Sequence, residues 1–213
     1  MFTHKLQWLN AGNKTAKLQL ECIQTLPYQF PNEEIIALEV GSAYGGGAEM
    51  MGKTFKELFC KYKVYGYDTF EGHPKDLADN PTDAEALCMD LWYKEPHYGL
   101  NKLSYEYQRI ILDEEGLDNV ILVKGRVNKH SFDDIEKVHF AIFDMDLVKP
   151  TKIAYEALKD KFVKGAYLFL HDALPKDNLV HLSKYIYDEV VPDKRWEMFG
   201  EFHNGYVLVL HKI

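Results

Sequence analysis

The sequence predicts an α/β protein built around a doubly wound, mostly parallel sheet of seven strands with an antiparallel strand pair at its C-terminal end. Two observations predict this fold class. Short apolar runs alternate with segments of helical periodicity, which is typical of a parallel sheet covered on both faces. The last two apolar runs follow one another without a helix between them, which favours an antiparallel pair. The 213 residues are most simply one domain, spanning 1–213.

The first half of the chain reads as three helices and three strands. They are expected, in order, as a helix at 17–26, a strand at 35–40, a helix at 48–62, a strand at 63–67, a helix at 103–115 and a strand at 120–124. Pro27 and Pro31 are expected to end the first helix. Gly116 is well placed to stop the third helix.

The second half continues the alternation and then breaks it. The expected elements are a strand at 138–143, a helix at 150–162, a strand at 166–170, a helix at 178–191 and strands at 195–202 and 205–211. Pro150 lies in the first turn of its helix, where a missing N–H costs little. Pro192 closes the last helix, and a His203-Asn204 turn joins the two final strands.

Two segments lie outside this alternation. Residues 1–32 are expected to form an N-terminal helical segment. Within it, residues 1–29 could pack on a partner, such as a second copy of the chain in a homodimer, or form a lid. Residues 71–104 are irregular and contain several prolines, so we expect a lid-like insertion that helps to build the acceptor pocket.

Composition and charge exclude several classes of protein. Hydrophobic residues make up 46% and charged residues 27% of the chain, as in an ordinary soluble globular protein. A formal net charge of −8 argues against a nucleic-acid partner. No run approaches the roughly 20 apolar residues of a membrane span, and residues 1–10 show no apolar signal core. Three cysteines in no metal or disulfide spacing suggest reduced thiols, so we expect a cytoplasmic protein without a membrane partner.

A glycine-rich turn directly follows the first strand, in the segment Glu39-Val-Gly-Ser-Ala-Tyr-Gly-Gly-Gly47. An acidic residue, a tight turn and a following helix form a cradle for a nucleotide-containing cofactor, because glycine permits positive φ angles and close approach of the backbone. The spacing differs from the Gly-x-Gly-x-x-Gly fingerprint, and no phosphate loop is present, so ATP or GTP is not expected. A plain tight turn is the competing interpretation.

Asp68 ends the second strand, one strand–helix–strand step after Gly41. A carboxylate at that place can accept hydrogen bonds from both ribose hydroxyls of an adenosine cofactor, which favours an unphosphorylated ribose. A solvated turn aspartate is the alternative.

Polar residues also end the fourth and fifth strands, as Asp144 and Asp146 and as His171 and Asp172. Ligands of open parallel sheets bind beyond the carboxyl ends of the strands, so these side chains are expected to meet. Three carboxylates and an imidazole suit Mg²⁺, Mn²⁺ or another divalent ion, unless some of them cap helices. Lys149 is a candidate base or electrostatic stabiliser, with a surface lysine as the competing interpretation.

These features together resemble the class I S-adenosylmethionine-dependent methyltransferases, which have a Rossmann-like sheet with an antiparallel last strand. More narrowly, the chain is similar to the macrocin O-methyltransferase type, metal-dependent enzymes that methylate sugar hydroxyls of natural products. The segments that carry the resemblance are 37–46 (ALEVGSAYGG), 64–74 (VYGYDTFEGHP), 123–125 (VKG), 143–147 (FDMDL) and Pro150-Thr151.

The resemblance implies S-adenosylmethionine as cofactor, Mg²⁺ or Mn²⁺ as metal, and a small hydroxylated acceptor such as a sugar. The implied cofactor-binding residues are Glu39, Gly41, Ser42, Tyr44, Gly45, Asp68, Thr69, Phe70, Gly125, Arg126 and Asp144. The implied metal ligands are Asp144, His171 and Asp172, and the catalytic candidates are Asp146, Lys149 and His171. The family has paired aspartates where this chain has His171-Asp172, and histidine favours Mn²⁺, Fe²⁺ or Zn²⁺ over Mg²⁺.

Three rival functions fit parts of this pattern. A metal-free methyltransferase would use His171 as its base. A non-catalytic protein would bind an adenosine cofactor without turnover. A nicotinamide-dependent oxidoreductase is disfavoured by the glycine spacing.

Overall fold

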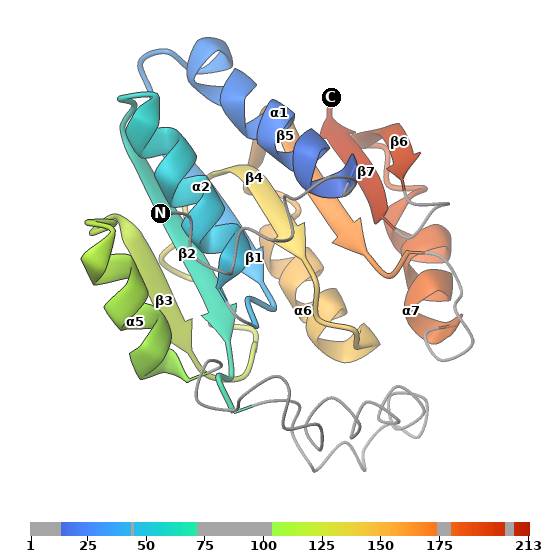
Figure 1. The fold of residues 1–213 in the computed structure, drawn as a ribbon. Helices are drawn as coiled ribbons and strands as arrows, with labels where there is room; N and C mark the ends of the chain where they lie inside the picture. Colours follow the sequence, from blue (N-terminus) through green and yellow to red (C-terminus); the bar gives the residue numbers. More distant parts are fainter. Residues whose placement is uncertain (1–13, 44, 72–103, 174–179, 203–206) are drawn as a thin grey trace.

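A seven-stranded sheet forms the centre of the protein, with the strand order β3-β2-β1-β4-β5-β7-β6 (Figure 1). The computed structural model describes residues 14–43, 45–71, 104–173, 180–202 and 207–213. The strands are β1 (Ile35–Val40), β2 (Tyr62–Asp68), β3 (Val120–Lys124), β4 (Val138–Phe143), β5 (Phe162–His171), β6 (Trp196–Phe202) and β7 (Val207–Lys212). The first five strands are parallel, and β7 runs antiparallel to both β5 and β6. The predicted fold class, including the antiparallel pair, is confirmed.

Helices cover both faces of this sheet (Figure 1). They are α1 (Lys14–Gln29), α2 (Gly46–Glu57), α5 (Tyr105–Glu114), α6 (Val148–Leu158), α7 (Val180–Tyr185) and the π-helical turn η6 (Ile186–Val190). Apolar side chains of α1, α2 and α5 share one buried cluster, and those of α6, α7 and η6 share the other. None of the helices in the described residues is long and apolar enough to cross a membrane.

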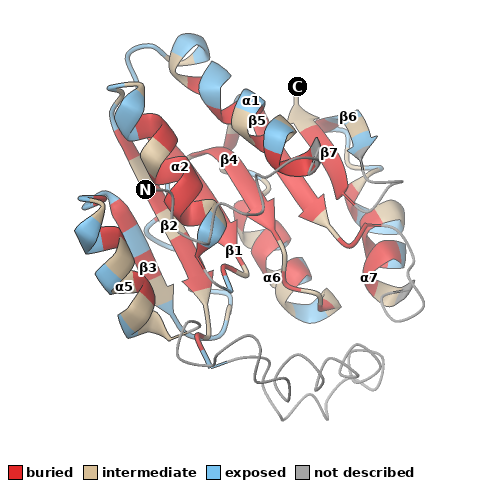
Figure 2. Ribbon diagram, in the orientation of Figure 1, coloured by how far each residue is buried: buried red, intermediate tan, exposed pale blue. Residues whose placement is uncertain are grey.

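The central strands are buried on both faces, which explains why the sequence shows them as nearly continuous apolar runs, with Glu39 in β1 and His139 in β4 as polar exceptions. All residues of β1 and β4 are buried, and Figure 2 shows these strands in red between the two helical layers. Side chains of β1 alternate between the clusters: Ile36 and Leu38 face α6, whereas Ile35 and Ala37 face α1 and α2. The sheet is therefore a rigid base for the loops at its edge.

The element boundaries differ from prediction in the helices. Helix α1 continues to Gln29 with Pro27 in its last turn, where the missing N–H removes a single helical bond. Helices α2 and α6 end before the predicted positions, because Tyr62 opens β2 and Phe162 opens β5. Both aromatic residues continue the apolar spacing of the preceding helix, so periodicity alone extends the helix through the turn. The predicted helix at 178–191 is instead the short α7 followed by η6.

A buried hydrogen-bond chain fixes α6 against the C-terminal strands. Tyr155 Oη donates to Asp193 Oδ2 at 2.6 Å and accepts from Trp196 Nε1 at 3.1 Å. Tyr155→Phe removes the acceptor of this indole N–H, so we expect the free energy of unfolding to fall by about 1–3 kcal/mol in urea denaturation. Tyr28→Phe, at a residue 79% exposed, is the matched control and should unfold like the wild type. Equal midpoints for Tyr155→Phe and the wild type would contradict the buried chain.

Candidate active site

The carboxyl ends of four neighbouring strands bring the candidate site together. Strands β2, β1, β4 and β5 are adjacent and parallel, so the turns that follow them lie along one edge of the sheet. The glycine-rich turn follows β1, Asp68 ends β2, Asp144 follows β4, and His171 ends β5. This placement agrees with the sequence-based expectation.

The turn after β1 requires glycine at Gly41. Its φ is +90°, and a Cβ there would lie 1.9 Å from the main-chain oxygen of Asp144. The Asp144 amide donates to the Val40 carbonyl at 2.9 Å, so the turns after β1 and β4 are in direct contact. Gly45, with φ of +66°, is the N-cap of α2. The glycine-rich turn and the acidic residues that follow β4 are therefore one structural unit.

Glu39 holds this turn from its buried side. Its carboxylate accepts from the amides of Gly47 at 3.1 Å and Ala48 at 2.8 Å, at the N-terminus of α2. Burial raises the pKa of Glu39 to about 8, opposed by the Ala48 N–H and reinforced by the negative charges of Asp144 and Asp68. The sequence placed Glu39 along the cofactor; the structure places its carboxylate behind the turn, 8% exposed. The negative charges of Asp144 and Asp68 beside this turn favour a cationic ligand.

Asp68 connects the turns after β1 and β2. Its Oδ2 accepts from the Ala43 amide at 2.9 Å, and its Oδ1 accepts from the Phe70 amide at 2.7 Å. Phe70 is buried with a φ of +54° and packs edge-on against the Tyr105 ring. The neighbouring Thr69 hydroxyl accepts from the Glu71 amide at 3.3 Å.

The remaining predicted cofactor residues occupy different places. The Gly125 amide donates to the Asp68 carbonyl at 2.8 Å, which brings the end of β3 beside this site, and Arg126 is exposed next to it. Ser42 is buried and donates from its hydroxyl to the Glu39 carbonyl at 3.2 Å. Tyr44 and residues 72–103 of the predicted lid lie outside the described residues.

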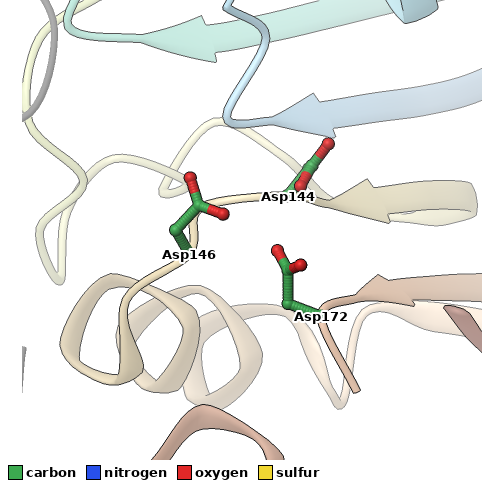
Figure 3. Close-up of side chains that lie close together, drawn as sticks. All are labelled: Asp144, Asp146 and Asp172. Carbon is green, nitrogen blue, oxygen red and sulfur yellow. The ribbon is translucent and has the colours of Figure 1, made fainter. Parts of the chain in front are cut away.

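Three aspartates form an acidic group at the ends of β4 and β5. Carboxylate oxygens of Asp144, Asp146 and Asp172 lie within 4.8 Å of one another. Figure 3 shows the three side chains close together at this end of the sheet. Asp146 and Asp172 have φ angles of 60° and 56°, a left-handed conformation that aspartate tolerates better than most residues. Carboxylates this close repel one another unless a cation or protons neutralise them, and oxygen ligands fit Mg²⁺ or Mn²⁺.

His171 lies beside this group but is not one of the three. Its Nδ1 is 3.3 Å from Asp144 Oδ2, and its Nε2 is 3.2 Å from the side-chain nitrogen of Gln19 in α1. The sequence predicted His171 as a metal ligand, whereas the residues that the structure gathers as a potential ligand set are the three aspartates. Lys149 is exposed in the first turn of α6.

Two glutamines at this edge were missed by the sequence analysis. Gln108 of α5 is 1% exposed, and its side-chain nitrogen donates to the Ala43 carbonyl of the glycine turn. Gln19 of α1 is 7% exposed and contacts His171 as described. Each interrupts an apolar helical stripe, with Leu112 one turn after Gln108 and Ile23 one turn after Gln19. A polar residue at a core-facing position is the signal that could have found them.

The sheet order, the antiparallel C-terminal pair and the helices on both faces define a Rossmann-like methyltransferase fold. No protein-family model matches the chain, and no curated protein matches its sequence.

Solved structures are similar to it over almost its whole length. The O-methyltransferase NovP has a TM-score of 0.70 at 17% identity, covering 94% of this chain and 80% of NovP. The calicheamicin methyltransferase CalS11 has a TM-score of 0.65 at 17% identity, covering 97% of this chain and 82% of CalS11. A SAM-dependent methyltransferase from Aquifex aeolicus has a TM-score of 0.51 at 18% identity, covering 100% of this chain and 98% of that protein. At these identities the likeness establishes the fold.

Proposed function

We propose that this protein is an S-adenosylmethionine-dependent O-methyltransferase that uses a divalent metal to methylate a hydroxyl of a sugar or another small diol-bearing molecule. The observation that carries the proposal is the direct contact between the glycine turn and the acidic group. At Gly41 a Cβ would reach the Asp144 main-chain oxygen, so a donor bound at the turn lies next to the three carboxylates. NovP, an O-methyltransferase, and CalS11, described as a TDP-rhamnose 3'-O-methyltransferase, share the fold and support the choice of acceptor.

The cofactor fits the turn through charge and through open acceptor positions. The sulfonium and ammonium groups of S-adenosylmethionine are cationic, and Asp68 and Asp144 place negative charge around the turn. Asp68 Oδ2 accepts from the Ala43 amide, and a carboxylate oxygen has a second lone pair for a ribose hydroxyl. Gly125 and Arg126 at the end of β3 are assigned to the adenine edge.

The residues of the acidic group divide the chemistry between them. Asp144 and Asp172 are assigned to hold the metal, which when bound lowers the pKa of a chelated acceptor hydroxyl. Asp146 accepts the hydroxyl proton. The acceptor oxygen forms its new bond to the methyl carbon in line with the breaking carbon–sulfur bond, whose electron pair stays on sulfur. The site's contribution is alignment of the two reactants in addition to proton removal.

The decisive experiment is methyl transfer from labelled S-adenosylmethionine to a panel of nucleotide-sugar and catechol acceptors, with Mg²⁺ or Mn²⁺ and with a chelator. Transfer that the chelator abolishes supports the proposal. Transfer that resists the chelator supports the metal-free alternative. Calorimetric binding of S-adenosylmethionine without transfer to any acceptor supports a non-catalytic binder, and failure to bind it contradicts all three.

Removing the Gln108 amide is expected to weaken cofactor binding. In Gln108→Leu the Ala43 carbonyl loses its buried donor, so the glycine turn is less well fixed. We expect the Kd for S-adenosylmethionine to rise about tenfold, equivalent to about 1.4 kcal/mol. Glu106→Gln, an exposed change on the same helix, is the control, and calorimetry is the measurement. An unchanged Kd in Gln108→Leu would show that the turn is held without this contact.

A further inference from the structure

Two side chains join the N-terminal helix to the acidic group. His171 is 17% exposed, and its ring lies between Asp144 Oδ2, at 3.3 Å from Nδ1, and the Gln19 amide nitrogen, at 3.2 Å from Nε2. Gln19 is 7% exposed, so bulk water competes little for this contact. Gln19 and His171 are separated by 152 positions in the sequence. Helix α1 therefore reaches the acidic group through one imidazole.

The orientation of the Gln19 amide in the structure favours one tautomer of the neutral ring. The Gln19 amide nitrogen only donates, so His171 Nε2 must accept. A neutral imidazole then carries its proton on Nδ1, which faces the Asp144 carboxylate. The hydrogen bond from Gln19 to His171 and the contact from His171 to Asp144 then run in the same direction.

We propose that Gln19 and His171 form a positioning pair that fixes the carboxylate of Asp144, so that docking of α1 is part of the assembly of the active site. The inference rests on the proposed function, in which Asp144 holds the metal. In this proposal His171 acts through Asp144, beside the three aspartates that could hold a metal. Partners that orient a metal ligand change metal affinity or activity by about 10- to 100-fold when they are removed.

A short series of variants isolates the pair. Gln19→Met keeps the unbranched shape of the side chain but removes the amide. Gln24→Met is the matched control, because Gln24 is exposed on the same helix. His171→Asn removes the imidazole, and the double variant Gln19→Met with His171→Asn tests whether Gln19 acts through His171. Circular dichroism and thermal unfolding establish which variants fold.

Nitrogen NMR of the histidine rings, at one fixed pH and without metal, tests the pair itself. The His171 signal is assigned by its loss in His171→Asn. We expect a single Nδ1–H tautomer in the wild type and in Gln24→Met, and a changed spectrum in Gln19→Met. A His171 spectrum that is identical in Gln19→Met and the wild type overturns the pair.

Mn²⁺ affinity, measured by electron paramagnetic resonance, and steady-state kinetics test the positioning role. We expect Gln19→Met to weaken Mn²⁺ binding about tenfold and to lower kcat, with the KM for S-adenosylmethionine unchanged within about twofold. The double variant should match His171→Asn, because Gln19 acts on the Asp144 carboxylate only through His171. Additive effects, or unchanged affinity and kcat in Gln19→Met, overturn the proposal.

Failure of the proposed function has a different signature. A wild-type protein that binds S-adenosylmethionine but no Mn²⁺ contradicts the metal assignment, and the pair is then judged by the NMR comparison and by kcat. If Gln19→Met does not fold, His171→Asn alone decides: unchanged Mn²⁺ affinity and kcat in that variant overturn the pair.

Discussion

Asp144→Asn is expected to abolish methyl transfer and leave S-adenosylmethionine binding measurable. The substitution keeps the shape of the side chain and the main-chain oxygen against which Gly41 packs. It removes one of the three carboxylates of the acidic group. Of the two assigned metal ligands, only Asp172 would then keep its negative charge. We expect kcat to fall by more than about 100-fold, beyond the usual effect of a residue that only supports a ligand.

The measurements are methyl transfer, Mn²⁺ affinity and calorimetric binding of the cofactor. Asp134→Asn is the control, because Asp134 is an exposed aspartate outside the site. Asp146→Asn completes the comparison: a lost kcat with retained Mn²⁺ affinity identifies Asp146 as the base, and lost affinity identifies it as a ligand. Unchanged turnover in Asp144→Asn would contradict the proposed role of the acidic group.

The sequence was sufficient for the fold because its strands are buried on both faces. Val138–Phe143 reads as a nearly continuous apolar run, with His139 as its polar exception, because helices cover both of its faces. The predicted boundaries were wrong where apolar spacing continues through a turn. Phe59, with φ of +53°, lies in such a turn between α2 and β2, and the helical pattern does not reveal it.

The candidate site could be predicted as far as strand ends determine it. Asp144 and Asp172 were placed together by the rule that ligands bind beyond the carboxyl ends of parallel strands, and the structure brings them together. The connection of Gln19 to His171 could not be predicted, because it depends on how α1 packs across the sheet. The same holds for Gln108, whose contact with Ala43 joins segments 65 positions apart. Such contacts depend on tertiary packing. In the sequence they are visible only as a polar residue within an apolar helical stripe.

Gly41→Ala is the test of the contact that joins the cofactor turn to the acidic group. The added Cβ would lie 1.9 Å from the Asp144 carbonyl oxygen, and the φ of +90° is strained for any residue with a side chain. Since the obstacle is main chain, relief requires the turns after β1 and β4 to move apart. We expect the free energy of unfolding to fall by about 3 kcal/mol or more, together with the loss of cofactor binding and of high-affinity Mn²⁺ binding.

Gly46→Ala separates this effect from a general intolerance of the glycine run. Gly46 lies in the first turn of α2, and a Cβ there has nothing within 4 Å, so alanine should leave stability unchanged or raise it by up to about 1 kcal/mol. Urea denaturation compares the two variants directly. A Gly41→Ala protein that unfolds at the wild-type midpoint would show that the turns after β1 and β4 are not in contact in solution. A destabilised Gly41→Ala protein that loses cofactor and metal binding together is the outcome expected if one backbone contact supports both halves of the site.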